Sequence, residues 1–290
     1  MTPSKYIYCV ICAGRKSNVI INFVKTLRHH TSSTYPHTLP EKLYSFFLAP
    51  LLLVGLIFIC IKIFHLPFIR LPGISFYDIG MASIFTLGRL LSAYVLAIIV
   101  AIPLAILATH SSIAEKILLP VFDILESVPI LAFFPVLIFL FFKFGALNLA
   151  AIFILFLSML WNIVFTLVGG IKIIPQDIIS AAKVFKINGW QYLRRVLLPA
   201  IFPEIVTGSI LAMAQGWNLI IVAEVMHTYI PHGTASQDLF GLGSILVNSA
   251  SSGQNSVFLV TLLAMILIIA LFNFFVWQKL LHHAQRFKFE

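Results

Sequence analysis

The stretch IISAAKVFKINGWQYLRRVLLPAIFP, residues 178–203, lies between two long apolar runs and carries four cations and two prolines. Ile178, Ala182 and Phe185 fall at helical spacing and form a narrow apolar stripe. The Asn188–Gly189 pair tolerates positive φ and predicts the end of this helix. A second short helix follows, and its prolines mark the entry into the next apolar run. The stretch therefore predicts a pair of short amphipathic helices between two membrane-length segments.

The composition of the whole chain predicts a membrane protein. Sixty per cent of the 290 residues are hydrophobic, ten per cent are charged, and the mean hydropathy is +1.04. A water-soluble fold cannot bury that much apolar surface. About 20 apolar residues are needed to cross a bilayer as a helix. Six stretches qualify: 46–64, 84–108, 121–142, 148–174, 201–227 and 257–281.

These runs are too long and too uniformly apolar for barrel strands, so the predicted fold class is an all-α polytopic membrane protein with about six transmembrane helices. Pro103, Pro129 and Pro135 lie inside predicted spans. We expect neighbouring helices to accommodate all three without loss of the span.

The distribution of Lys and Arg predicts the orientation. With six spans, both termini share a side with segments 109–120 and 175–200, and this side carries fifteen of the nineteen Lys and Arg residues. The opposite loops hold Arg70 and Lys143. The positive-inside rule therefore predicts cytoplasmic termini and a cytoplasmic 175–200 loop. The net charge of +9 follows this topology, and no basic face that would favour nucleic acid is visible.

The chain divides into a predicted basic cytoplasmic extension, residues 1–45, and a predicted transmembrane domain, residues 46–290. Cys9 and Cys12 form an isolated C-x-x-C, which we interpret as incidental thiols and not as a metal or redox site. Residues 6–13 are too short an apolar run for a signal peptide.

A short basic helix with an apolar stripe has two ordinary uses. It can lie in the lipid headgroup layer, or it can dock into a groove on a soluble partner. The residues alone favour neither use.

Several separated motifs resemble one transporter family. SAAKVFKINGWQYLRRVLLPAIFPEIVTG (180–208) resembles the cytoplasmic EAA loop of bacterial ABC-importer permeases, E-A-A-x-x-x-G followed further on by hydrophobic-Leu-Pro. ESVPILAFFPVLI (126–138), GWNLIIVAEV (216–225) and GLG (241–243) resemble the nitrate/sulfonate/taurine branch of these binding-protein-dependent permeases. The resemblance extends over about residues 80–281.

The resemblance implies a multi-pass permease subunit in a bacterial inner membrane. Such a subunit forms the path for a small solute, such as nitrate, a sulfonate, taurine or a similar anion. Its implied partners are a cytosolic ABC ATPase dimer, a second permease copy or a paralogue, and an extracytoplasmic substrate-binding protein. In such importers ATP and Mg are used by the ATPase. This chain carries no phosphate-binding loop, H-E-x-x-H or G-x-S-x-G motif, so we expect it to bind no cofactor and to be a transport subunit and not an enzyme. The alternative is a secondary transporter, or another six-span protein, without ATPase coupling.

The resemblance also assigns a coupling role, in which the EAA helix sits in a cleft of the ATPase. The residues concerned are Ser180, Ala181, Ala182, Phe185, Lys186, Gly189, Leu198 and Pro199. Ser180 stands where the family has Glu, and Lys186 stands where it has Gly, although Gly189 offers a turn three residues later. We interpret these departures as fitting a partner with an adjusted cleft; the alternative is a degraded subunit with weak coupling.

Small and polar residues inside the spans predict packing and a path. Alanines at four-residue spacing (Ala93, Ala97, Ala101, Ala105) and Gly208, Ala212 and Gly216 predict close helix packing. The candidate translocation-path residues are Ser127, Ser158, Asn162, Gln215, Asn218 and Glu224. Polar groups at membrane depth are expensive, and structural interhelical hydrogen bonding is the alternative role for Ser158, Asn162, Gln215 and Asn218.

The positions of these side chains carry further expectations. Gln215 and Asn218 are expected to share the inward face of Gly208 and Ala212, whereas Glu224 projects from nearly the opposite side and is open to snorkelling at the outer boundary. Asp123 and Glu126 are expected near the cytoplasmic end of the third span, with interfacial solvation. In the related permeases, the region of Phe240–Ser244 helps form the outer gate and receives the binding protein.

Overall fold

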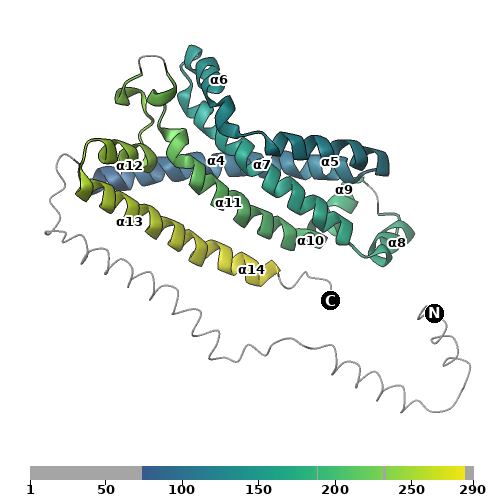
Figure 1. The fold of residues 1–290 in the computed structure, drawn as a ribbon. Helices are drawn as coiled ribbons and strands as arrows, with labels where there is room; N and C mark the ends of the chain where they lie inside the picture. Colours follow the sequence, from purple (N-terminus) through teal and green to yellow (C-terminus); the bar gives the residue numbers. More distant parts are fainter. Residues whose placement is uncertain (1–73, 188, 231–232, 285–290) are drawn as a thin grey trace, which may run out of the picture. The chain divides into compact units, whose positions relative to one another are not determined.

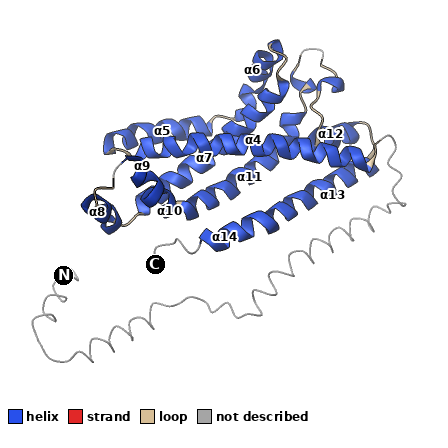
Figure 2. Cartoon of the chain, turned by 180° about the vertical axis from the view of Figure 1, so that it is seen from behind, coloured by secondary structure: helices blue, strands red, loops and turns tan. Residues whose placement is uncertain are grey.

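The computed structural model describes residues 74–187, 189–230 and 233–284, and within these ranges it contains helices, turns and loops but no strand (Figures 1 and 2). Four of the helices are long and apolar enough to cross a membrane, or five spans result if one bent helix pair is counted as a span. The predicted all-α membrane fold is thus confirmed. The predicted extension 1–45 and the predicted first span 46–64 lie outside the described residues.

The first described helix, α4 (Phe76–Thr109), begins earlier than the predicted span 84–108 because a capping box precedes it. The Ser75 hydroxyl accepts a hydrogen bond from the Tyr77 N–H at 3.3 Å, and the Asp78 carboxylate accepts one from the Ser75 N–H at 2.9 Å. This reciprocal arrangement satisfies amides that otherwise lack a partner in the first turn. The helix then continues through Pro103, as expected.

The predicted span 121–142 is two helices, α5 (Ser112–Ser127) and α6 (Ile130–Lys143), whose axes differ by 80°. The prediction of one continuous helix is therefore wrong. Pro129 has no N–H to donate and disfavours the helical conformation of the preceding residue, so Val128 is extended, with ψ 125°. The expectation that neighbours accommodate the proline holds for Pro135 inside α6 but not for Pro129.

The centre of the bundle is α7 (Leu147–Ile173), which packs along both α4 and α11 (Phe202–Glu224) (Figure 1). The predicted small-residue packing is confirmed. All four alanines of the α4 stripe are fully buried. On α11, a Cβ added to Gly208 would lie 3.1 Å from the Cβ of Thr166 on α7. These helices approach closely because side chains at the contact are small.

The remaining elements lie at the two ends of the bundle or along α11. Between α7 and α11 come α8 (Gln176–Val184), α9 (Gly189–Tyr192), the π-helical turn η1 (Leu193–Leu197) and α10 (Leu198–Ala200). After α11 come η2 (His227–Tyr229), η3 (Ala235–Gln237), α12 (Leu242–Ser251), α13 (Asn255–Phe272), the π-helical turn η4 (Asn273–Trp277) and α14 (Gln278–Ala284). We call the end where α7 stops and α11 starts the α8 end, and the opposite end the α12 end (Figure 1).

Candidate functional site

The loop from α8 to α10 lies at the α8 end and is anchored to the bundle by part of its apolar stripe (Figure 1). Ile178 and Ile179 pack against the core, and Ala182 is 4% exposed. Phe185 does not belong to this buried stripe, because α8 stops at Val184 and the Phe185 side chain is 76% exposed. The predicted stripe is therefore confirmed for its first turns and wrong for Phe185.

The end of α8 is a Schellman-type turn centred on Lys186. The Ile187 N–H donates to the Ala182 carbonyl at 2.9 Å, and the Lys186 N–H donates to the Lys183 carbonyl at 3.0 Å. Lys186 takes a left-handed conformation, with φ 52°. This position normally holds Gly, because an L-residue with a side chain pays about 1–2 kcal/mol there. The predicted stop at Asn188–Gly189 is thus too late, although Gly189 also has positive φ, 56°.

The remaining predicted coupling residues are divided between the loop surface and its base. Ser180 and Ala181 are exposed on α8, and Leu198 and Pro199 are half-buried in α10, at the entry into α11. Three large apolar side chains also face outward: Val184 is 78% exposed, Phe185 76% and Trp190 70%. Exposed apolar side chains of this size suit either use expected of the loop, contact with lipid headgroups or with a soluble partner.

The same loop carries four cations, two that flank Val184 and Phe185 in sequence and two that follow Trp190. Lys183, Lys186, Arg194 and Arg195 are all exposed, and within the described residues none of them forms an ion pair. Arg194 and Arg195, together with Trp190 and Gln191, line a shallow concavity of about 550 Å³. We call the eight exposed residues Ala181, Lys183, Val184, Phe185, Lys186, Trp190, Arg194 and Arg195 the basic coupling surface.

The candidate path residues on α11 do not share the buried face of Gly208 and Ala212. Gln215 and Asn218 are exposed, so they do not face other described helices of this chain, and their role in a path stays a prediction. They belong to an exposed stripe of α11 at positions 207, 211, 214, 215 and 218, on the side away from α7. Gln215 follows Gly208 by seven residues, which is within about 20° on a helix, so it lies where the buried face of Gly208 and Ala212 borders the exposed stripe.

The candidates on α7 and α5 are in different surroundings. The Ser158 hydroxyl is buried and donates to the Leu155 carbonyl at 2.7 Å, and the Asn162 amide donates to the Ser158 carbonyl at 3.3 Å. Ser127 is exposed at the end of α5 and donates to the Asp123 carbonyl at 2.7 Å. Their role in a path stays a prediction.

Asp123 and Glu126 are both exposed on α5, but not at its start. Eight residues separate Asp123 from Glu115, which pairs with Lys172 at the α8 end, and at 1.5 Å per residue this is about 12 Å along the helix. Both carboxylates lie in the second half of α5, because α5 begins at Ser112 and not at the predicted residue 121, and their expected position near the cytoplasmic end stays a prediction.

Glu224, the last residue of α11, lies in a buried polar cluster and does not snorkel to solvent. Its side chain is fully buried, and one carboxylate oxygen accepts from the Arg89 guanidinium at 2.7 Å and from the Thr86 hydroxyl at 2.8 Å. The other oxygen accepts from the Gly243 N–H at 2.7 Å. Arg89 is 7% exposed and also donates to the Phe240 carbonyl at 3.0 Å. The interpretation of Glu224 as a boundary residue is therefore wrong, since its charge is neutralised inside the protein.

The GLG motif is explained by this cluster. A Cβ on Gly241 would lie 2.3 Å from each Glu224 carboxylate oxygen, and a Cβ on Gly243 would lie 2.8 Å from the Ile221 Cα. The Leu242 N–H donates to the Thr86 hydroxyl at 2.9 Å. Glycine at 241 and 243 thus lets the backbone approach the carboxylate closely, which joins the start of α12 to α4 and α11.

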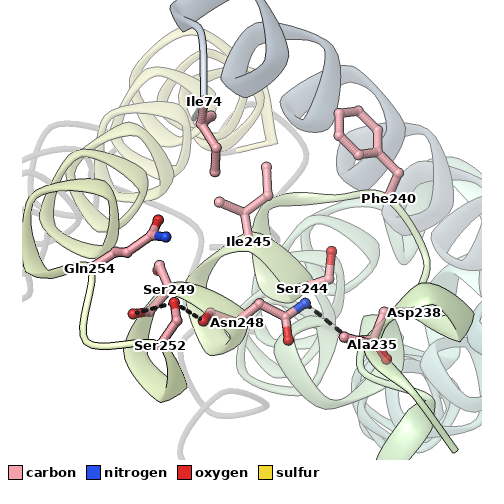
Figure 3. Close-up of a pocket in the computed structure, with 10 residues that line it drawn as sticks. All are labelled: Ile74, Ala235, Asp238, Phe240, Ser244, Ile245, Asn248, Ser249, Ser252 and Gln254. Carbon is pink, nitrogen blue, oxygen red and sulfur yellow. Dashed lines mark hydrogen bonds between the residues drawn. The ribbon is translucent and has the colours of Figure 1, made fainter. Parts of the chain in front are cut away.

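A second polar network lies beside α12. Figure 3 shows a pocket of about 400 Å³ whose polar side chains are Asp238, Ser244, Asn248, Ser249, Ser252 and Gln254. The Asp238 carboxylate is 3% exposed and accepts from the His227 Nδ1–H at 2.8 Å and from the Asn248 amide at 3.1 Å. It also accepts from the N–H groups of Met226 and His227. Asp238 therefore binds the loop after α11 to α12.

Three residues of these networks, Thr86, Arg89 and Asp238, were not among the candidates from the sequence. Arg89 inside a predicted span was a readable signal, because a buried cation requires a buried anion and Glu224 is also inside a predicted span. Pairing the two needed the register of α4 against α11, which one sequence does not contain.

Comparison with known proteins agrees with the resemblance. Residues 97–286 match the family described as binding-protein-dependent transport system inner membrane component. The chain is 32% identical to a nitrate import permease protein of Leptolyngbya laminosa over 193 residues, and the aligned region covers 66% of this chain and 63% of the relative. It is 34% identical over 161 residues to a bicarbonate transport system permease protein of Synechocystis sp., covering 52% of this chain and 55% of the relative.

A taurine transport system permease protein of Escherichia coli is 29% identical over 141 residues, which covers 49% of this chain and 50% of the relative. The chain therefore spans between half and two thirds of the length of these relatives. The family match covers most of the chain, includes the α8–α10 loop, and agrees with a multi-pass helical protein of the inner membrane. The chain belongs to the family of binding-protein-dependent transport system inner membrane components.

Proposed function

We propose that this chain is the transmembrane permease subunit of an ATP-binding-cassette importer. Its partners are a cytosolic ATPase dimer, a second permease copy or a paralogue, and an extracytoplasmic binding protein, and ATP and Mg are bound by the ATPase. The observation that supports this most directly is the basic coupling surface, which presents three exposed apolar side chains on a loop held between two spans.

The connection of this loop to the bundle suits the transfer of movement. α8 follows α7 after two residues, Ile174 and Pro175, and α10 leads into α11 through Ile201, which is 1% exposed. A displacement of α8 by a partner would therefore act on two packed spans at once. Because α7 packs along both α4 and α11, a tilt of these helices relative to each other is the kind of rigid-body change that alternating access uses.

The exposed stripe of α11 supports a path at an interface between two permease subunits. Gln215 and Asn218 are exposed in the second half of a 23-residue span, at least six residues from its end. Amide side chains that face lipid at this depth are expensive, whereas they are favourable against water or against a polar partner. We place the path, or the second permease subunit, on this side of α11.

For the solute we propose a small anion of the kind that the relatives are named for. A buried carboxylate at the end of α11 would repel anions if it were unpaired. The ion pair with Arg89 removes that objection, because Glu224 adds no net charge to the bundle. The orientation proposed from the positive-inside rule puts the α8 end, with Lys172, Lys183, Lys186, Arg194 and Arg195, in the cytoplasm.

The proposed coupling is tested by photocrosslinking from two matched phenylalanines. Phe185 on the coupling loop is 76% exposed, and Phe139 on α6 is 75% exposed. Each is replaced by a photoreactive phenylalanine in the full chain, expressed in its own host, and the crosslinked products are identified by mass spectrometry.

Position 185 is expected to capture a soluble protein with an ATP-binding cassette, and position 139 is expected to capture lipid or membrane protein only. Capture of lipid alone at position 185, while the variant remains folded in the membrane, would reject the proposed function.

A further inference from the structure

We infer that the partner ATPase receives the basic coupling surface in a groove lined by carboxylates. We also infer that the charge of Lys186 serves this contact, although a lysine side chain strains the left-handed turn at this position. This inference rests on the proposed function and adds the chemistry of the partner. It is carried by the backbone conformation at Lys186 and, independently, by the balance of charges around it.

The backbone at Lys186 favours another residue. Its φ of 52° lies in the left-handed region, where an L side chain is strained and Gly is not. The Schellman-type hydrogen bond from the Ile187 N–H to the Ala182 carbonyl requires this conformation. Folding of the loop therefore gains nothing from a lysine here. A strained residue on an exposed functional loop points to a use for its side chain.

The Lys186 side chain makes no interaction that would compensate the strain within the protein. It is exposed, and within residues 74–187, 189–230 and 233–284 its ammonium group has no carboxylate partner. Its neighbour Lys183 is in the same situation. By comparison, Lys172 on α7 pairs with Glu115 at 2.6 Å.

The charge balance of the surface specifies the partner. Four exposed cations, Lys183, Lys186, Arg194 and Arg195, face one acidic residue of the loop, Asp177 at the start of α8. Position 180 has a neutral serine, so no anion lies on the exposed side of α8 after its first turn. A groove that receives Val184 and Phe185 also comes close to Lys183 and Lys186, which flank them in sequence, and complementary charge there means Asp and Glu.

The test uses zero-length carbodiimide crosslinking, which joins a lysine amine to a carboxylate in direct contact. The full chain and its ATPase, purified together from the native host in mild detergent, are treated and analysed by peptide mass spectrometry. The Lys172–Glu115 pair supplies an internal positive control. The expected products join Lys183 or Lys186 to Asp or Glu peptides of the ATPase.

Two variants separate the charge of Lys186 from its turn. Lys186→Gly keeps the left-handed conformation and relieves its strain, so poor folding cannot explain a loss of ATPase. We expect the retained ATPase to fall about two- to five-fold, the range for one exposed ion pair. Lys183→Glu with Lys186→Glu is expected to lower it about ten-fold or more through like-charge repulsion. Lys143→Glu, an exposed cation at the end of α6, is the matched control and is expected to change nothing.

Salt supplies a second measurement. Raising the ionic strength from about 0.1 M to about 1 M shortens the Debye length from about 10 Å to about 3 Å, so retention by the unmodified chain should fall and retention by Lys186→Gly should fall less.

The outcomes distinguish the two proposals. If position 185 captures an ATPase but Lys186→Gly retains as much of it or more, and no carboxylate bond forms, the acidic groove is wrong and the proposed function stands. If the lysines join only to lipid headgroups while position 185 also captures only lipid, both fail.

Discussion

Replacing Glu224 by Gln removes the anion from a buried cluster while keeping the shape of the side chain. The structure offers two ion pairs of nearly equal length for comparison. The Arg89–Glu224 pair measures 2.7 Å with side chains 7% and 0% exposed, and the Lys172–Glu115 pair measures 2.6 Å with side chains 42% and 39% exposed. Distance is therefore matched, and burial is the variable.

The expected magnitudes follow from that difference. Glu224→Gln leaves the Arg89 guanidinium charged, buried and without its anion, which costs about 3–5 kcal/mol of the free energy of unfolding. Glu115→Gln leaves Lys172 in contact with solvent, so its expected cost is at most about 1 kcal/mol. Removal of both buried charges, Arg89→Met with Glu224→Gln, is expected to cost less than Glu224→Gln alone, because no uncompensated charge remains.

The assay is reversible unfolding of the purified full chain in mixed detergent micelles, measured by tryptophan fluorescence. It gives the free energies for a double-mutant cycle over positions 89 and 224. A coupling free energy of about 2 kcal/mol or more is expected. If Glu224→Gln costs no more than Glu115→Gln, or if the two buried substitutions add within about 0.5 kcal/mol, the view of Glu224 as half of a buried ion pair is refuted.

Three further changes test other parts of the fold and the path. Gly241→Ala places a Cβ 2.3 Å from the Glu224 oxygens and is expected to lower the free energy of unfolding by about 1–3 kcal/mol. Gly88→Ala on α4, where the added Cβ meets open space, should raise that free energy by about 0.5–1 kcal/mol. Equal effects of the two substitutions in the same unfolding assay would contradict the close approach at Gly241. The next test uses a chain whose own cysteines are replaced. In it, the thiol of Asn218→Cys should react with a charged methanethiosulfonate at least about ten-fold faster than that of Leu267→Cys, because only a hydrated thiol ionises. Equal rates would mean that the α11 stripe faces lipid. If the exposed face of α5 also borders an anion path, Asp123→Asn with Glu126→Gln should raise uptake of isotope-labelled nitrate or taurine by cells, and reduced uptake at equal expression would argue for a solute that is not an anion.

Much of the fold could be predicted because membrane spans are encoded locally. Runs of apolar residues predicted α7, α11 and the α13–α14 helix to within a few residues, since a span needs only length and hydropathy. The alanine repeat of α4 predicted a packed face, and all four alanines are buried. The motif at residues 180–208 predicted the family, which the match over residues 97–286 confirms.

The errors occurred where a local signal had two possible outcomes. A proline in a membrane helix is accommodated or breaks it, and Pro129 breaks it whereas Pro103 and Pro135 do not. The end of the first loop helix was expected at Asn188–Gly189, but α8 ends at Val184 and Lys186 takes the left-handed position of its last turn, although Gly189 also has positive φ. Neither choice is visible without the neighbouring helices.

Composition, the periodicity of small residues and the cation bias along the chain were sufficient for the membrane class, the packed face of α4 and a short amphipathic helix between two spans, because each depends on residues close together in sequence. The Arg89–Glu224 pair, the reason for Gly241 and Gly243, and the exposed side of α11 required the folded bundle. Residues separated by 135 positions meet in that pair. Their register depends on how three helices pack, and that packing is a property of all their side chains together.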